Sequence, residues 1–219
     1  MTQWRVIEAD RRTAYCPIAL DLRDEFTGGA VLGRVEIELD LQHGPLWAPS
    51  GHRPVRSPSG LFVFTGLGHA VDPLALPSFK VRVRIAADYY RPAYRTTVDG
   101  LEFDVATYNH AVPPAVSPLM PEMVLMHPNS AYPFGGHLRV LRGRVVDPGG
   151  DPVADASIEA DGVERVISDD RGAFGLPLRW QAANAAVAVL VDHPRSGLAA
   201  AAAFNLPGAL TGNHDIQIT

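Results

Sequence analysis

The segment RGRVVDPGGDPVADASIEAD, residues 142–161, and its continuation SDDRGAF, residues 168–174, decide how this chain folds. A β-branched pair opens the segment, and the turn-forming residues 147–152 follow it. In such a turn proline fixes φ, glycine supplies positive φ and aspartate bonds its own backbone. Ala156 and Ile158 then alternate with polar residues, as they do on a half-buried strand. The pattern therefore predicts strands separated by tight turns.

Four parts of this segment resemble the carboxypeptidase regulatory-like domain, a small β-sandwich with a transthyretin-like fold. The family pattern has a G-x-V strand, a G-x-P-V turn, a short strand of small residues and a T-D-x-x-G-x-F turn. The matching residues are 143–145, 150–153, 155–158 and 168–174. The resemblance covers about the last third of the chain. It implies a packing or binding module, because such domains usually carry no catalytic residues.

Composition narrows the class of protein. The chain has 219 residues, of which 47% are hydrophobic, 20 are glycine and 19 are proline. This length allows one large or two small domains, and the glycine and proline content predicts many turns between short elements. The net charge of −5 argues against non-specific binding to nucleic acid or to anionic membranes. With no secretory leader and no apolar run of about 20 residues, we expect a soluble, cytoplasmic protein.

The alternation of apolar and polar residues predicts further strands in the first half of the chain. Trp4 and Val6 are expected to line a short first strand. Residues 35–41 place apolar side chains on one face and acidic ones on the other, namely Glu36, Glu38 and Asp40. Residues 80–85 alternate apolar side chains with cations, namely Lys80, Arg82 and Arg84. We expect these last two strands to pair, since opposite charges that face each other across a sheet select the partner strand.

The first half of the chain also repeats the second. Residues 20–31, 57–62 and 79–85 correspond to residues 144–153, 169–174 and 185–191. The same alignment places residues 94–98 level with residues 199–204, at a strand position. We therefore predict an all-β protein of two tandem antiparallel β-sandwiches, transthyretin-like or Ig-like in kind, at residues 1–112 and 137–219.

Residues 113–136 form a connector with too many prolines for a helix and too many apolar residues for a free linker. Two interpretations remain open. In the first, the connector packs along the sandwiches and buries Met120, Met123, Leu125 and Phe134. In the second, it presents an adaptable, methionine-lined surface to a partner protein. The candidate partner-binding residues are six of its large side chains: Met120, Met123, Leu125, Met126, Tyr132 and Phe134.

The stretch LAAAAAF at residues 198–204 sets two principles against each other. Alanine is the best helix former, but an isolated helix this short is marginal, and the repeat indicates a strand. A strand with small apolar side chains on both faces allows other parts of the protein to pack closely against both of its faces. We therefore predict a strand whose outer face is covered by the connector or by a second subunit. Ala201 and Ala202 join the candidate partner-binding residues, and a homo-oligomer is compatible with this interpretation.

Motifs for catalysis are missing from the sequence. It contains no phosphate-binding loop, no His-Glu-x-x-His and no Gly-x-Ser-x-Gly. The single cysteine, Cys16, excludes an internal disulfide, and its apolar context before Pro17 is typical of a buried, inert thiol. The eight histidines lack metal-ligand spacing. We expect no enzymatic activity, no cofactor and no metal site.

Two groups of side chains have both a structural and a functional interpretation. Asp169 and Asp170 could hold Ca²⁺, but turn formation is the favoured role. Tyr89, Tyr90 and Tyr94 could stack on a sugar, but aromatic residues in a sandwich more often cover its core. The structural interpretation is favoured for both groups.

The leading functional hypothesis is a structural or assembly protein that contacts other proteins. The segment at residues 131–146 is similar to accessory proteins of contractile phage-tail-like injection particles, which implies a place in a large assembly. The alternative is a ligand-binding module, with a carbohydrate as the ligand. A third hypothesis is hydrolysis in the manner of transthyretin-related enzymes, which end in a Tyr-Arg-Gly-Ser-type sequence. This chain ends in DIQIT at residues 215–219, which speaks against it.

Overall fold

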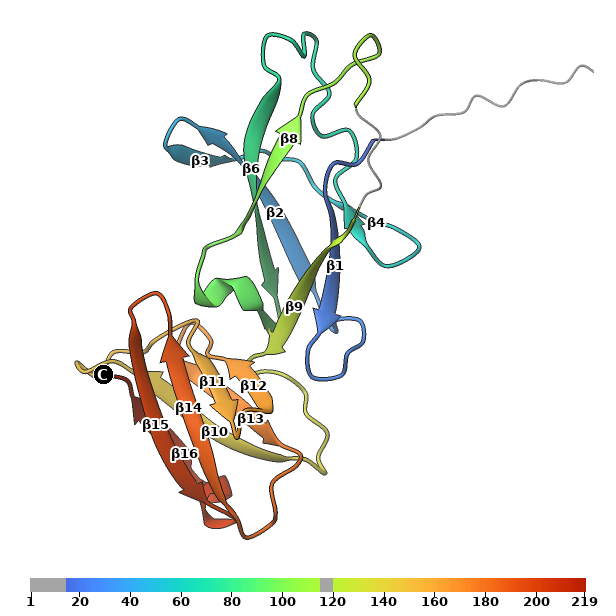
Figure 1. Cartoon of the computed structure of the whole chain (residues 1–219). Helices are drawn as coiled ribbons and strands as arrows, with labels where there is room; N and C mark the ends of the chain where they lie inside the picture. Colours follow the sequence, from blue (N-terminus) through green and yellow to red (C-terminus); the bar gives the residue numbers. More distant parts are fainter. Residues whose placement is uncertain (1–14, 115–119) are drawn as a thin grey trace, which may run out of the picture.

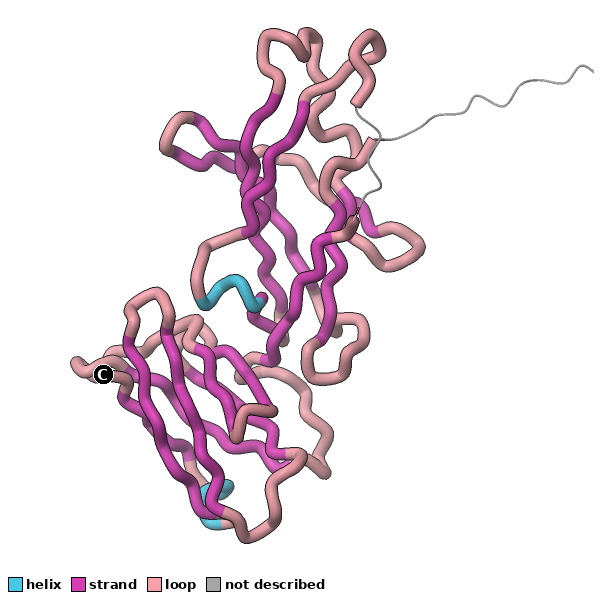
Figure 2. Tube along the Cα trace, viewed as in Figure 1, coloured by secondary structure: helices cyan, strands magenta, loops and turns pink. Residues whose placement is uncertain are grey.

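The chain forms two β-sandwiches, one above the other in Figure 1, in a computed structural model that describes residues 15–114 and 120–219. Strands and loops make up nearly all of these residues, and the helices among them are two short 3₁₀ turns (Figure 2). The prediction of an all-β sandwich fold is confirmed. The short first strand expected at Trp4 and Val6 lies outside the described residues.

The first sandwich has one sheet in the order β4-β5-β1-β9-β7 and another in the order β3-β2-β6-β8. Its core lies between the sheets, where Leu20 and Val124 of one sheet meet Ile37 and Val81 of the other. Its elements are β1 (Ala19–Asp24), β2 (Val35–His43), β3 (Leu46–Pro49), β4 (Val55–Arg56), β5 (Phe62–Val63), β6 (Ser78–Ala87), β7 (Tyr90–Pro92), η1 (Ala93–Thr96), β8 (Leu101–Ala106) and β9 (Glu122–Pro128).

The second sandwich packs a sheet in the order β13-β10-β16 on a sheet in the order β12-β11-β14-β15. Leu141 and Phe174 of the first sheet lie in one buried cluster with Ile158 and Val189 of the second. The elements are β10 (Arg139–Val146), β11 (Ser157–Ala160), β12 (Glu164–Ile167), β13 (Ala173–Leu178), β14 (Ala186–His193), β15 (Leu198–Asn205), η2 (Gly208–Thr211) and β16 (Asn213–Gln217).

The two sandwiches share one strand topology. In each, a central strand pairs antiparallel with one neighbour and parallel with the last strand: β1 with β5 and β9, and β10 with β13 and β16. The other sheets, β3-β2-β6-β8 and β12-β11-β14-β15, correspond strand by strand. The predicted repeat is therefore present in the topology. The two parallel pairs were not predicted, because alternation does not reveal strand direction.

One part of the predicted alignment is wrong. Residues 94–98, expected to form a strand level with residues 199–204, lie in η1 and the turn after it. The topological counterpart of β15 is β8 instead, since β8 pairs with β6 as β15 pairs with β14. The pairing predicted from charge is confirmed: β2 and β6 are antiparallel neighbours, with Glu38 opposite Arg84 and Asp40 opposite Arg82.

The connector divides into two parts with different roles. Its first part contains β9, which pairs parallel with β1 and completes the first sandwich. The first sandwich therefore extends to Pro128, beyond the predicted boundary at residue 112. The strand escaped prediction because its inward residues, Val124 and Met126, lie between large apolar neighbours that hide the alternation. The rest of the connector carries the chain to β10.

The motif that predicted the second sandwich has a steric basis. Gly143 faces inward on β10, and a Cβ there would lie 2.3 Å from the carbonyl oxygen of His214 and 2.7 Å from the ring of Phe174. Gly172 adopts a φ of +72°, and a Cβ on it would lie 2.5 Å from the carbonyl oxygen of Val145. The glycines thus admit the aromatic ring and the tight turn that close the sandwich.

Candidate functional site

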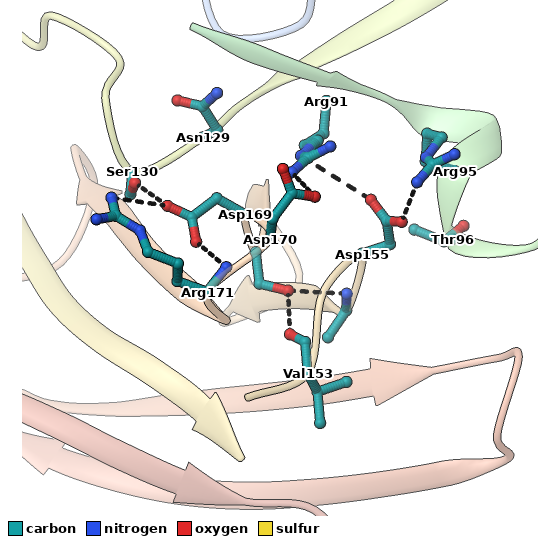
Figure 3. Close-up of polar contacts among 12 residues, drawn as sticks. Arg91, Arg95, Thr96, Asn129, Ser130, Val153, Asp155, Asp169, Asp170 and Arg171 are labelled. Atoms are coloured by element: carbon teal, nitrogen blue, oxygen red, sulfur yellow. Dashed lines mark hydrogen bonds and ion pairs between the residues drawn. The ribbon is translucent and has the colours of Figure 1, made fainter. Parts of the chain in front are cut away.

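The two sandwiches meet through ion pairs that join β7 and η1 to the turns before β11 and β13. Arg91 and Arg95 of the first sandwich point toward Asp155 and Asp170 of the second (Figure 3). Arg95 Nη2 donates to Asp155 Oδ2 at 2.8 Å, and Arg91 Nε lies 3.9 Å from Asp155 Oδ1. Arg91 also pairs with Asp170. We call these four residues the arginine–aspartate junction.

Asp155 is the buried centre of this junction, with 4% of its surface exposed. Its φ of 60° lies in the left-handed region, which aspartate tolerates better than most residues. A carboxylate buried to this degree is costly unless cations neutralise it. The two arginines supply that charge from the other sandwich, so the buried carboxylate links the turn before β11 to the first sandwich.

Asp169 performs the turn role that its motif predicts. Its Oδ1 accepts backbone hydrogen bonds from Arg171 and Ala173, both at 2.9 Å. Its other oxygen, Oδ2, accepts from the Ser130 hydroxyl at 2.5 Å, which ties the segment between the sandwiches to the second sandwich (Figure 3). Because Asp169 forms the turn and Asp170 binds Arg91, both carboxylates have protein partners.

Two arginines of the second sandwich reach in the opposite direction. Arg179 donates to the carbonyl oxygen of Phe26 at 2.9 Å, and its guanidinium lies 4.2 Å from the centre of the Phe26 ring. Its side chain also bonds both carboxylate oxygens of Glu164, at 2.6 and 2.9 Å. Arg195 donates to Asp99 at 2.8 Å. Contacts between the sandwiches therefore extend beyond the junction.

The segment between the sandwiches is anchored in the first one. The Tyr132 hydroxyl donates to Asp24 Oδ2 at 2.8 Å, and the Tyr132 ring packs against Phe26 and Phe134. Burial, together with the hydrogen bond to Asp24, raises the pKa of Tyr132 far above its usual value. Tyr132 therefore stays protonated and acts as a permanent donor to the buried carboxylate.

His127 lies beside the junction, where β9 meets β12. It is 4% exposed, and its Nδ1 has no hydrogen-bond partner among the described residues. Glu25 Oε2 is 3.8 Å away from this nitrogen. Burial, reinforced by the nearby Arg165, lowers the pKa of His127 to about 4. His127 is therefore neutral at pH 7 and lines a cavity of about 370 Å³ between the sandwiches.

The structure separates the predicted partner-binding residues of the connector. Met120, Met123 and Leu125 are 83%, 62% and 39% exposed, so the expectation that they are buried is wrong. Met123 and Leu125 share the outward face of β9, where they lie opposite Asp21 and Arg23 of β1. The three other candidates face the protein interior: Met126 is fully buried, Tyr132 is 7% exposed, and Phe134 is half-buried against the core.

The two alanine candidates lie on opposite faces of β15. The predicted strand is confirmed, since β15 spans Leu198–Asn205 and pairs with β14. Ala201 is exposed and Ala202 is half-buried toward the core. Within the described part of the chain, nothing covers the outer face that carries Ala201. The described residues of the connector do not cover this face, and coverage by a second subunit stays a prediction.

The tyrosines considered for sugar stacking are used in the core of the first sandwich. Tyr90 is 1% exposed, and its hydroxyl donates to Asp24 and accepts from the backbone of Leu32. The Tyr94 hydroxyl accepts from the backbone of Ile85 at 2.8 Å. Burial raises the pKa of Tyr94 to about 12. Neither ring is free to stack on a ligand.

The described contacts between the sandwiches are ion pairs, hydrogen bonds and packing of Arg179 on the Phe26 ring. No cluster of three His, Cys, Asp or Glu side chains suited to a metal ion occurs in residues 15–114 and 120–219. Within the same ranges, no helix is long and apolar enough to cross a membrane. The sequence did not predict the junction residues. In a sequence, an arginine near the end of a strand has the same pattern of neighbours whether its side chain is solvated or bound to another domain.

Comparisons with known proteins place the chain in no family. No protein-family model matches it, and no curated protein sequence is significantly similar. Among solved structures, the Bacillus anthracis TIE protein is similar over 94% of this chain, with 12% sequence identity and a TM-score of 0.28. This chain spans 34% of the length of that one. A TM-score this low indicates neither a shared family nor a shared function.

Proposed function

We propose that this chain is a non-catalytic assembly protein, a two-sandwich body that contacts other proteins through exposed apolar strand faces. The observation that carries the proposal is the pair Met123 and Leu125 on the outward face of β9, which is exposed together with Met120 just before the strand. Large apolar side chains exposed on one strand face are typical of interaction sites. Methionine suits such a site because its flexible thioether adapts to a partner.

Strand β9 also offers backbone groups to a partner. On one side it pairs with β1, and on the other β7 pairs only with residues 126–128. Among the described strands, none pairs with the second edge of β9 before Met126. A strand of another protein could add to this edge while its side chains contact Met123 and Leu125, the mode of recognition known as β-augmentation.

A second exposed face supports the same function. On the outward side of the pair β14 and β15, Ala188 lies opposite Ala203 and Leu190 lies opposite Ala201. Leu190 is 53% exposed. Such small side chains allow a close approach of another protein surface. This face and the β9 face lie on different sandwiches, which the arginine–aspartate junction holds together.

The kind of sandwich and the assembly are also part of the proposal. The shared strand topology and the motif at residues 143–174 support the transthyretin-like, carboxypeptidase regulatory-like assignment for both sandwiches. The segment at residues 131–146 supports a contractile phage-tail-like particle as the assembly. A rigid adaptor with two separated contact faces is suited to such a particle.

The test compares purification partners of matched variants. The double variant Met123→Glu and Leu125→Glu places charges on the β9 face, and Val163→Glu places one at a turn that is equally accessible, with Val163 55% exposed. Tagged proteins are purified from the source cells, and partners are identified by mass spectrometry. The proposal expects discrete partners with the wild-type protein and with Val163→Glu, and their loss with the double variant. Retention of the same partners by a folded double variant would contradict it.

A further inference from the structure

A cavity of about 700 Å³ lies in the first sandwich, where the end of β2 meets the connection from β5 to β6. Apolar side chains line its inner part: Leu67 is 1% exposed, and Leu41 and Phe79 are half-buried. Exposed polar side chains line its mouth: Gln42, His43, His52, His69, Lys80 and Asp104. A volume of about 300–1,000 Å³ with an apolar interior and a few polar groups is typical of small-molecule sites.

The cavity is built from segments that the second sandwich lacks. The connection from β5 to β6 spans residues 64–77, whereas its counterpart from β13 to β14 spans residues 179–185. The connection from β3 to β5, which carries His52, is likewise longer than residues 168–172 in the second sandwich. Because the second sandwich folds with the short connections, the long ones are not required by the fold. They add a wall around a cavity.

That wall is held in place by backbone and side-chain hydrogen bonds. The Thr107 hydroxyl donates to the carbonyl oxygens of Pro73 and Leu76, and Asn109 Nδ2 donates to that of Val71 at 3.1 Å. Gly68, with a φ of +93°, approaches β8 so closely that a Cβ would lie 2.6 Å from the carbonyl oxygen of Ala106. A loop tied down in this way provides a preformed site, which lowers the entropic cost of binding.

The polar mouth indicates the kind of polar group that the ligand carries. Lys80 and Asp104 lie opposite each other on β6 and β8, so their formal charges balance. The three histidines and Gln42 add hydrogen-bond donors around them. We propose that this cavity binds a small amphipathic molecule, with an apolar chain or ring inside and a group that accepts hydrogen bonds, such as a carboxylate, at the mouth. This activity goes beyond the proposed assembly function and does not depend on it.

Decanoate, and its neutral analogue decanol, are suitable probes for calorimetric titration of the full chain. We expect decanoate to bind with a dissociation constant below about 1 mM. Amide NMR shifts should map to Gly66, Gly68 and His69, which line the cavity. The proposal would be overturned if decanoate did not bind with a dissociation constant below about 1 mM. Amide shifts away from the cavity, or binding of maltose in place of decanoate, would overturn it as well.

Two neighbouring leucines provide a matched pair of variants. Leu76 lines the cavity and is 55% exposed, whereas Leu74, on the same loop and 80% exposed, does not line it. Leu76→Ser should weaken decanoate binding about fivefold or more, and Leu74→Ser less than about twofold. Lys80→Gln should weaken the binding of decanoate but not of decanol. Equal effects of the two leucine variants, or decanol binding as tightly as decanoate, would overturn the assignment, and circular dichroism checks that each variant is folded.

Discussion

Arg95 and Asp155 join the two sandwiches through a carboxylate that is almost completely buried. Arg95 Nη2 lies 2.8 Å from Asp155 Oδ2, and Asp155 is 4% exposed. The two residues are 60 positions apart and belong to different sandwiches. The pair therefore forms only when both sandwiches are folded and docked. Removal of one partner of a buried pair leaves an uncompensated charge, which costs more than the loss of a surface pair.

Asp155→Asn should lower the free energy of unfolding by about 2 kcal/mol, because the charge-assisted bond to Arg95 is lost. Asparagine tolerates the positive φ at this position, so the backbone is not strained. Urea unfolding measures the change. Asp170→Asn is the control: the Asp170 side chain is 81% exposed, and its loss should cost below about 1 kcal/mol. Equal losses for both variants would contradict the central place of Asp155.

His127 should make the stability of the protein depend on pH. Burial lowers the pKa of His127 in the folded protein to about 4, from 6.5. Between these values the unfolded chain binds the proton and the folded protein does not. The contribution of His127 is therefore complete above pH 6.5 and is lost as the pH falls toward about 4, by roughly 3 kcal/mol in total.

The neighbouring Glu25 acts in the opposite sense. Burial, followed by repulsion from Glu164, raises the pKa of Glu25 above 4.5. Its contribution to stability is thus lost as the pH rises through the folded-state pKa. The variant His127→Gln isolates the histidine: its unfolding free energy should change less between pH 7 and pH 4 than that of the wild-type protein. Parallel pH profiles for the two proteins would show that His127 is not the titrating group.

Sequence reasoning succeeded where the pattern was local. The alternation in residues 35–41 and 80–85 predicted two strands, and their charges predicted that the strands pair. It failed at β9, because large apolar residues on both faces hide the alternation of apolar and polar residues that is typical of a strand. The prolines around the segment also favoured its interpretation as a connector. The arginine–aspartate junction was also missed, because Arg91 and Asp155 acquire their roles only where the two sandwiches meet.

Asp40 should stabilise the first sandwich through its two arginines. It is 2% exposed and accepts hydrogen bonds from Arg82 at 2.9 Å and Arg84 at 2.8 Å. The bond from Arg84, chiefly, lowers the pKa of Asp40 below 3.8. Its contribution is therefore present above pH 3.8 and is lost as the pH falls through the folded-state pKa.

Asp40→Asn should accordingly cost about 2 kcal/mol at neutral pH, measured by urea unfolding. Glu38→Gln provides the comparison, because Glu38 pairs with the same Arg84 at 2.9 Å but its side chain is 59% exposed. That substitution should change the unfolding free energy by less than about 0.5 kcal/mol. A larger effect at Glu38 than at Asp40 would contradict the assigned importance of burial.

Gly143→Ala should destabilise the second sandwich, because the new methyl group would lie 2.3 Å from the carbonyl oxygen of His214. We expect a loss of about 2–3 kcal/mol from overpacking. Gly136→Ala is the matched control, since a Cβ at Gly136 has no atom within 4 Å. Thermal unfolding followed by circular dichroism compares the two variants. A Gly143→Ala protein as stable as Gly136→Ala would refute the steric role of this glycine in the motif.

Site-specific photo-crosslinking in the source cells tests the proposed assembly function most directly. A photoreactive phenylalanine analogue replaces Met123 on the β9 face in one protein and the equally accessible Val163 in another; these side chains are 62% and 55% exposed. The account predicts discrete cross-linked protein species from position 123 and none of them from position 163. Irradiation that yields no adduct from position 123, or the same adducts from both positions, would contradict a partner-binding role for the β9 face.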